Sequence, residues 1–562
     1  MQKKIAHIVV DLPIEGHFDY LLPEEYQEAA KRGMRVLVSF ARQKRIGVIV
    51  DFASRSSIPK LNPVLALLDE EPVFTPEFLK FGEVFALRFG CSLGEALIQF
   101  LPKYLRGAKK FVSPARIGKP EEGSEKIAKT APTPAACSTD LIFDRGLTKR
   151  WDILTPLIAG TVAAGKGVIC AVPDGTHLDA VVPKLTAIGL APVLLSQGTD
   201  KKECEHWNAL RTGSARVAVG FISSVLAPVR DVGLIVIFEE DNPFYKHDQS
   251  PFYHARDAAL LRAKLEGCRV VLVTSAPSLA AWHAAEEGHA ELKLLTDDLP
   301  PVKFLDLRNF KMKKDTFLSP ALRHHIEWAR KEGRKVLLYI QAARGVTGII
   351  DEVKAQFPSA RVAGYDKAST TFPTDAEVVV ATQAIFRHRY QARFDIIAVL
   401  DIDWEFHKSD YRAAHGAFAL TQHFRQMAKE FVLLQTRHME HELLHYLADD
   451  DIKKFYRKEL SLRKEMGLPP FKFLVALVVR SGDPQLACDE AKRLYDDLVS
   501  RKPEAVELHE PQQDRSAIVR GKFRWCVMAQ ARSLKTLMGL VKDAKRAFRG
   551  KRDTVVTVNV NP

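Results

Sequence analysis

The sequence predicts an α/β protein of several domains: a small N-terminal β domain, two parallel-sheet units and a C-terminal α+β domain. A chain of 562 residues is too long for one hydrophobic core. From residue 140 to about residue 450, short apolar runs alternate with helical stretches, a pattern typical of buried parallel sheets. The pattern occurs twice, over 140–300 and over 301–451. Two such units in succession indicate a two-lobed centre with a cleft between the lobes.

Residues 1–108 form the predicted N-terminal β domain. Segments 5–10, 34–40 and 45–52 are rich in β-branched residues and are separated by Pro, Gly and charged turns. Helical periodicity follows from Thr75 to Leu101, with Thr75 as the expected N-cap. Residues 109–139 hold Pro, Ala, Ser and charges without periodicity, which predicts a linker.

Both central units contain apolar segments of strand length. These segments are 167–173, 191–196, 216–221, 232–238 and 268–275 in the first unit and 335–340, 360–365, 376–382 and 396–403 in the second. Residues 452–562 alternate differently and predict an α+β domain. Its expected strands are 473–481, 525–531 and 554–560, and its expected helices are 453–467, 485–500 and 533–549.

Composition excludes several classes of protein. Hydrophobic residues make up 46% of the chain and charged residues 27%, as in ordinary globular proteins. There is no run of about 18 apolar residues, so we expect no membrane partner. Acidic residues come too early for a secretory signal, which favours a cytoplasmic location. The seven cysteines are scattered without a C-x-x-C spacing, which argues against a zinc site or a disulfide scaffold.

Positive charge is concentrated in two segments. The net charge is +13, and residues 520–552 hold eleven Lys or Arg against the single acid Asp543. Residues 103–136 carry eight Lys or Arg against three Glu. Basic stripes bind phosphates with release of counterions, so nucleic acid is the leading partner class. A basic solvated surface that serves solubility is the alternative.

Several segments resemble, in order, the PriA family of replication-restart helicases (primosomal protein N′). They are GHFDYLLPEE near the N-terminus, FEEDNPFYKHDQSPFYHARDAALLRAKLEG in the centre, then GLPPF and KFRW. The resemblance implies a superfamily 2 helicase core of two RecA-like lobes. It also implies an N-terminal domain that holds the terminal nucleotide of a DNA 3′ end at an F-D-Y motif.

The F-D-Y motif corresponds here to Phe18, Asp19 and Tyr20. An aromatic ring stacks on a base, and a carboxylate accepts a hydrogen bond from a sugar hydroxyl. Without the resemblance, the two aromatic residues would be interpreted as core residues of a strand. Two family positions differ, since Ala41 replaces a glycine and Asn62 a lysine. Nearby basic residues could compensate, among them Arg42, Lys44 and Lys60.

The nucleotide-binding motifs of the family are degenerate here. The P-loop aligns with residues 143–150 and keeps only Gly146 and Lys149. It lacks the other small residues and the hydroxyl that a phosphate-binding loop needs, because Phe143, Thr148 and Arg150 replace them. In the magnesium-binding motif, Phe238 replaces the first aspartate. We expect the remaining Glu239 and Glu240 to be solvated residues of a former metal site.

The second-lobe motifs differ as well. The segment that supplies arginine fingers aligns with 422–429, where Gln426 and Lys429 stand in place of the fingers. The zinc-binding insertion of the family would fall near 343–348, but the chain passes directly from strand to helix. We therefore expect no catalytic residue, no cofactor and no metal site, and binding of ATP or Mg²⁺ is not favoured.

The C-terminal domain keeps basic residues interleaved with aromatic ones, which suits DNA. The candidate DNA contacts are Lys522 and Arg524 near the KFRW segment and Lys542, Lys545 and Arg546 on the last helix. Lys535 and Arg549 extend the same helix face. A solvated face is the alternative.

Three functions remain open at this stage. The first is a non-catalytic replication-restart protein that binds forks, displacement loops or single strands and recruits primosome proteins, with single-strand-binding protein as a further partner. The second is a divergent but active ATP-dependent 3′–5′ helicase, in which Lys149→Ala would abolish DNA-stimulated ATP hydrolysis. The third is a protein-interaction scaffold without a DNA role.

Overall fold

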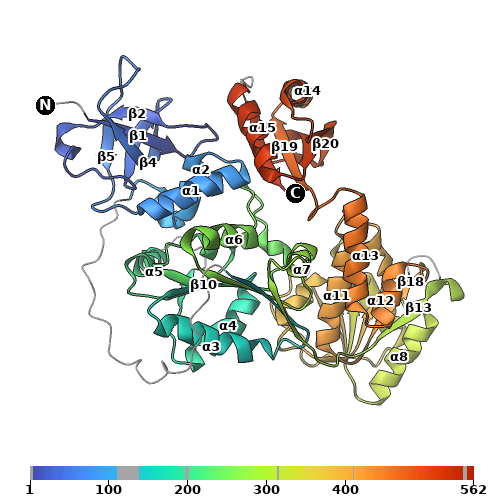
Figure 1. Cartoon of the computed structure of the whole chain (residues 1–562). Helices are drawn as coiled ribbons and strands as arrows, with labels where there is room; N and C mark the ends of the chain where they lie inside the picture. The colour runs from blue at the N-terminus through green and yellow to red at the C-terminus, as the bar shows by residue number, and fades with distance from the viewer. Residues whose placement is uncertain (1–3, 110–137, 196–200, 313–315, 409, 549–552) are drawn as a thin grey trace.

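The computed structural model describes residues 4–109, 138–195, 201–312, 316–408, 410–548 and 553–562 (Figure 1). Almost all of the predicted linker 109–139 lies outside these residues. Four sheets form the fold in the expected order: a small antiparallel sheet, two parallel sheets and a second antiparallel sheet. The predicted fold class is confirmed.

The N-terminal domain is a five-stranded antiparallel sheet followed by two helices. Its strands lie in the order β2-β1-β4-β3-β5. The bounds are β1 (Ile5–Val10), β2 (Phe18–Leu21), β3 (Arg35–Phe40), β4 (Gln43–Ala53), β5 (Val64–Leu67), α1 (Pro76–Phe89) and α2 (Leu93–Phe100).

The helical stretch expected from Thr75 to Leu101 is present as two helices, α1 and α2, which are separated at Gly90. Thr75 does cap α1 by accepting from the Phe78 N–H. Gly90 ends α1 in the left-handed conformation (φ 68°), and Ser92 starts α2 with a capping box to Glu95. Any side chain at Gly90 would also collide with the C-terminal domain, since a Cβ there would lie 2.6 Å from Val558 Cγ1.

The two central lobes repeat one topology. Lobe 1 has the parallel strand order β12-β6-β11-β10-β7-β9-β8, and lobe 2 has β13-β18-β17-β14-β16-β15. Numbered within each lobe, these orders are 7-1-6-5-2-4-3 and 1-6-5-2-4-3, so lobe 2 matches lobe 1 without its last strand. This repeat is the pair of RecA-like lobes that the sequence predicts.

The strands of lobe 1 are β6 (Thr139–Asp144), β7 (Gly167–Ala171), β8 (Val193–Leu195), β9 (Val217–Gly220), β10 (Val232–Phe238), β11 (Arg269–Thr274) and β12 (Glu291–Leu295). Its helices are α3 (Arg150–Ala163), α4 (Gly175–Ala187), α5 (Lys201–Thr212), α6 (Ala255–Glu266) and α7 (Leu279–Glu286). One core cluster joins α5 and α6 to α1 and α2, so the N-terminal helices pack on lobe 1.

The strands of lobe 2 are β13 (Val302–Asp306), β14 (Val336–Tyr339), β15 (Val362–Tyr365), β16 (Val378–Ala381), β17 (Phe394–Val399) and β18 (Ala428–Thr436). Its helices are α8 (Pro320–Lys331), α9 (Thr347–Gln356), α10 (Asp403–Phe406), α11 (Ala413–Met427) and α12 (Glu442–Ala448). Helix α13 (Ile452–Glu465) packs with this lobe through Phe455, Tyr456 and Leu460.

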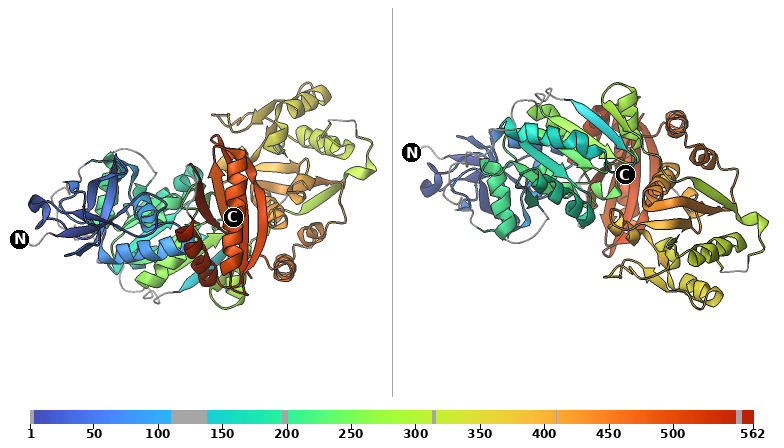
Figure 2. Two further views of the ribbon diagram at one scale, coloured as in Figure 1. Left: turned by 90° about the horizontal axis from the view of Figure 1, so that it is seen from above. Right: turned by 90° about the horizontal axis from the view of Figure 1, so that it is seen from below.

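The C-terminal sheet is antiparallel, in the order β20-β21-β19-β22. Its elements are β19 (Phe473–Ser481), α14 (Pro484–Arg501), β20 (Glu507–Val519), β21 (Lys522–Ala531), α15 (Leu534–Ala547) and β22 (Val555–Val560). Figure 2 shows this domain above the middle of the molecule, between the N-terminal domain and lobe 2. It contacts lobe 1 where Lys246 Nζ donates to the Val560 carbonyl (2.6 Å).

Candidate nucleic-acid interface and interlobe site

The degenerate nucleotide motifs meet at the carboxyl ends of the lobe 1 strands, where α/β sheets place ligand sites. The loops after β6, β10 and β11 face a short 3-10 helix, η7 (Gln383–His388), and helix α11 of lobe 2. Side chains from both lobes fill this position.

Arg150, at the position of the P-loop hydroxyl, is the centre of the lobe 1 half. Its guanidinium is 2% exposed and pairs with Asp144 Oδ2 (2.9 Å) and Glu239 Oε1 (2.6 Å). The residue also begins α3, and its backbone N–H donates to Asp144 Oδ2 (3.0 Å). Arg150 is therefore a buried cation whose charge is balanced by two buried carboxylates.

Arg389 completes the arrangement from lobe 2. Its guanidinium contacts Glu239 Oε2 (3.3 Å) and the Ser275 hydroxyl in lobe 1, and Gln426 Oε1 (3.0 Å from Nε) in lobe 2. Gln426 then donates from Nε2 to the Arg145 carbonyl of lobe 1 (2.8 Å). We call the buried residues Asp144, Arg150, Glu239, Arg389 and Gln426 the interlobe network.

The structure contradicts the expectation that Glu239 and Glu240 are solvated. They are 1% and 0% exposed. Burial alone would raise the pKa of Glu239, but Arg389 and Arg150 outweigh it and hold that pKa below its ordinary value. Glu240 pairs with Arg256 (2.9 Å) and accepts from the Ser278 N–H (2.6 Å).

Asp241 is the protonatable member of this region. Burial, together with the negative charges of Glu239 and Glu240, raises the pKa of Asp241 to about 8. The Thr274 hydroxyl donates to this carboxyl group. Asp241 therefore keeps its proton to a higher pH than an ordinary aspartate does.

The residues at this position do not fit a magnesium nucleotide. Lys149 is exposed, but its ammonium is paired with Asp297 Oδ1 (2.6 Å) and the Thr296 carbonyl (2.6 Å). The same Asp297 closes the loop, since a Cβ on Gly146 would lie 1.9 Å from its Oδ2. The Asp297 carboxylate therefore lies beside Gly146, at a position where a phosphate-binding loop needs accessible backbone N–H groups.

The two lobes are joined by further contacts around this network. Asp450 accepts from Arg145 (2.8 Å) and from Arg425 (2.5 Å), and so links the P-loop region to α11. On the other side, the Tyr456 hydroxyl donates to the Pro277 carbonyl (2.6 Å), and its ring stacks on Trp282 with centroids 4.3 Å apart. The lobes therefore form one packed body.

The F-D-Y residues at the N-terminal end do not share one face of the sheet. Tyr20 is 4% exposed and its hydroxyl donates to the Ser39 carbonyl (3.0 Å), so its ring is a core group that does not reach a base. Phe18 lies two residues away, half-buried, with its ring edge-on to Phe40 (4.7 Å between centroids). Asp19 points to the opposite face of β2, as strand alternation requires.

Asp19 is surrounded by polar side chains. Its Oδ2 accepts from the Ser56 hydroxyl, and its Oδ1 lies near His7 and His17. Neither histidine was predicted as a site residue from the sequence. The register of β1 and β2, which pairs His7 with Asp19, is the signal that could have found one of them.

The other predicted residues near this end are exposed. Ala41 and Arg42 form the two-residue turn between β3 and β4, and both have positive φ (48° and 65°). A glycine suits that conformation better than alanine does. Asn62 lies beside β2, because its carbonyl accepts from the Leu21 N–H (3.0 Å), and Lys60 is exposed nearby in sequence.

The C-terminal sheet adds a basic residue that the sequence did not single out. Arg480 on β19 lies directly opposite Arg524 on β21, so two positive charges are cross-strand neighbours. Like charges in that position repel, and of the two only Arg524 is seen to pair with an acid, Asp514 (3.1 Å). Both Nε atoms are buried without a hydrogen-bond partner in the described structure. A phosphate would compensate this pair, and Lys522 lies exposed on the same strand face.

The basic face of the last helix is only partly available. Lys545 was predicted as a DNA contact, but it joins two domains: it donates to the Gly90 carbonyl (2.9 Å), and its side chain is 8% exposed. Lys542 is half-buried and lines a small cavity against α1, whereas Arg546 and Lys535 are exposed. The expected contact Arg549 lies outside the described residues.

Two RecA-like lobes of one strand order, joined to a small β domain and a basic α+β domain, define a protein built on a superfamily 2 helicase-type core. A family model described as the 3′ DNA-binding domain (3′BD) of PriA matches residues 7–102. Over nearly its whole length the chain is similar to the PriA family of replication restart proteins.

The sequences of similar proteins align with nearly the whole chain. Replication restart protein PriA of Treponema pallidum is 23% identical over 99% of this chain and 98% of its own length. The proteins of that name from Rickettsia conorii and Haemophilus influenzae are each 22% identical, over 93% and 100% of this chain and 94% and 99% of their own lengths. Among solved structures, Saccharomyces cerevisiae Dbp5 bound to RNA and ADP BeF3 is 13% identical, covers 57% of this chain and 89% of its own, and has a TM-score of 0.37. The fold assignment rests on strand order, not on that score.

Among the described residues, no helix is both long enough and apolar enough to span a membrane.

Proposed function

We propose that this protein binds branched DNA during replication restart and helps recruit the primosome that reloads the replicative helicase, without unwinding DNA by ATP hydrolysis. The interlobe network carries the proposal. Arg150 and Arg389 form buried ion pairs with Glu239. These pairs lie where the aligned motifs of the family would hold nucleotide and magnesium. Gln426, aligned with an arginine finger, donates to a backbone carbonyl.

The network also argues against a motor for a mechanical reason. A helicase needs lobes that open and close around its nucleotide. Here, the lobes are held together by buried ion pairs and by the stacking of Trp282 on Tyr456. Separating the lobes would expose Glu239 and Arg389 unpaired, which is costly in a buried site.

Support for a DNA role comes from the ends of the chain. The N-terminal domain matches the 3′ DNA-binding domain family. The C-terminal sheet places Arg480 beside Arg524, with Lys522 exposed on the same strand face. Backbone phosphates are the ligands that such a group of cations attracts without regard to sequence.

A fork-binding assay over a range of salt concentrations, with and without ATP, tests the proposal. We expect the affinity to fall steeply with salt, by a slope of about −0.9 for each neutralised phosphate, and to be unchanged by ATP. Lys522→Ala should weaken binding, whereas Lys331→Ala, an exposed lysine on α8 of lobe 2, serves as the control.

Two results would count against it. Strand separation that requires ATP would favour an active helicase. Absence of salt-dependent binding to forked DNA would favour a protein-interaction scaffold.

A further inference from the structure

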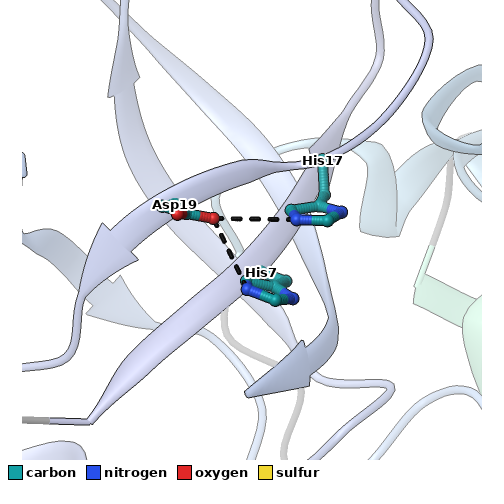
Figure 3. A group of neighbouring side chains, drawn as sticks. All are labelled: His7, His17 and Asp19. Carbon is teal, nitrogen blue, oxygen red and sulfur yellow. Dashed lines mark ion pairs between the residues drawn. The ribbon is translucent and has the colours of Figure 1, made fainter. Parts of the chain in front are cut away.

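Two histidines and one aspartate converge on one side of the N-terminal sheet (Figure 3). His7 on β1 is the direct cross-strand partner of Asp19 on β2. His17 precedes Asp19 by two residues, which places both on the same side of an extended chain. The strand register therefore brings together three side chains that are separated in sequence.

The distances between these groups are too long for hydrogen bonds. Asp19 Oδ1 lies 3.5 Å from His7 Nε2 and 3.7 Å from His17 Nε2. The two imidazole rings are stacked, with centroids 4.0 Å apart and planes 17° apart. One ligand atom from each residue lies within 4.8 Å of the others.

This spacing approaches that of a metal-ligand shell. Ligand atoms about 2.0–2.2 Å from a tetrahedral zinc ion lie roughly 3.3–3.5 Å from one another. The two N–O distances are close to that value, so small side-chain rotations would bring all three atoms to an ion. Among the residues that the structure describes, no other group of three His, Cys, Asp or Glu side chains meets this spacing.

The carboxylate is already oriented for such a role. The Ser56 hydroxyl donates to Asp19 Oδ2, which leaves Oδ1 turned towards the histidines. Hydrogen bonds of this kind fix ligand carboxylates in metal sites. The side chains of His7, His17 and Asp19 are 21%, 48% and 15% exposed, so the group is open on one side to an entering ion.

We propose that His7, His17 and Asp19 form a site for a divalent transition-metal ion of the zinc class, with one coordination position open. Two imidazoles and one carboxylate suit zinc and its neighbours, whereas magnesium and calcium prefer oxygen ligands alone. This site is unrelated to the zinc-binding insertion of the family, which this chain lacks in lobe 2.

Asp19 belongs both to this metal site and to the predicted contact with a DNA 3′ end. The second of these roles rests on the proposed function. An ion on Oδ1, with Ser56 on Oδ2, leaves little of this carboxylate to accept from a terminal hydroxyl. Zinc should therefore reduce the preference of the protein for DNA that ends in a 3′-hydroxyl over DNA that ends in a 3′-phosphate.

Calorimetric titration of the untagged full chain with Zn²⁺ tests the metal site without DNA. We expect saturable binding of one ion that Mg²⁺ does not reproduce. Ser56→Ala should weaken it about 10- to 100-fold, as loss of a supporting hydrogen bond does, and His7→Ala or His17→Ala should weaken it further. His438→Ala is the matched control: His438 is also about half exposed (45%) and lies 3.2 Å from Glu440, without a third ligand.

The outcomes separate the two proposals. Absence of saturable zinc binding, or binding that His17→Ala leaves unchanged, overturns the metal site. If zinc binds but the metal-free protein does not bind DNA, the proposed function fails and the metal site stands. If both bind and zinc leaves the 3′-hydroxyl preference unchanged, the competition for Asp19 is wrong.

Discussion

Replacing Arg389 with alanine should weaken the interface between the lobes by about 3–5 kcal/mol, the usual cost of removing one partner from a buried ion pair. Arg389 is 3% exposed and joins Glu239 (3.3 Å) to Gln426 (3.0 Å) across the interface. Without it, Arg150 is the one cation among the described residues that still contacts Glu239. The pKa of Glu239 should rise, because Arg389 is the largest of the positive charges that lower it.

Hydrogen exchange is the suitable assay, because a chain of several domains does not unfold in one step. We expect exchange in segments 238–242 and 384–392 to become about 100- to 4,000-fold faster, at one factor of ten for each 1.4 kcal/mol. Arg387→Ala is the control, since Arg387 is exposed and, among the described residues, its guanidinium contacts only the Lys367 carbonyl at 3.5 Å. Its effect should stay within about 0.5 kcal/mol.

A double-mutant cycle with Glu239→Gln isolates the ion pair. If the two side chains act together, the double variant should cost less than the sum of the single variants, by about 0.5–3 kcal/mol. Equal exchange rates in Arg389→Ala and Arg387→Ala, or strict additivity in the cycle, would refute the assignment of the interface to this network.

Three further predictions follow from individual residues. Burial raises the pKa of Asp241 to about 8, so the folded protein holds a proton that the unfolded chain releases above about pH 4. The stability of the fold should therefore fall as pH rises from about 4 to 8. In thermal melts, Asp241→Asn should flatten that fall. Arg480→Ala should weaken fork binding and reduce its salt slope by about 1, if a phosphate lies between Arg480 and Arg524; an unchanged slope would contradict this. Lys149→Ala should leave fork affinity and phosphate release unchanged, since the Lys149 ammonium is already paired with Asp297.

The sequence predicts most of the sheets because their strands are continuous apolar runs. Strand β10 (Val232–Phe238), buried along its whole length, is an example. By contrast, β20 escapes notice, because it pairs with a single neighbour and its residues are largely polar. The break at Gly90 is also missed, since the apolar periodicity continues through it into α2.

The candidate sites are harder to predict because they depend on distant pairs. Motif alignment marks Arg150 and Gln426 as departures, but only the fold shows that Arg389 reaches Glu239 from the other lobe. Glu239 then becomes a buried ion-paired residue, contrary to the expectation of a solvated one. In the same way, the side chain of Lys545 looks like part of a free basic face until the docking of α15 on Gly90 is known.

Phosphate release by the protein saturated with forked DNA, in the presence of Mg²⁺ and ATP, tests the central claim most directly. We expect no phosphate release above the protein-free background, either with or without DNA. A binding measurement at the same salt concentration confirms that the complex with forked DNA has formed. Turnover that the fork stimulates would contradict the claim that Arg150, Arg389 and Glu239 have replaced a working nucleotide site.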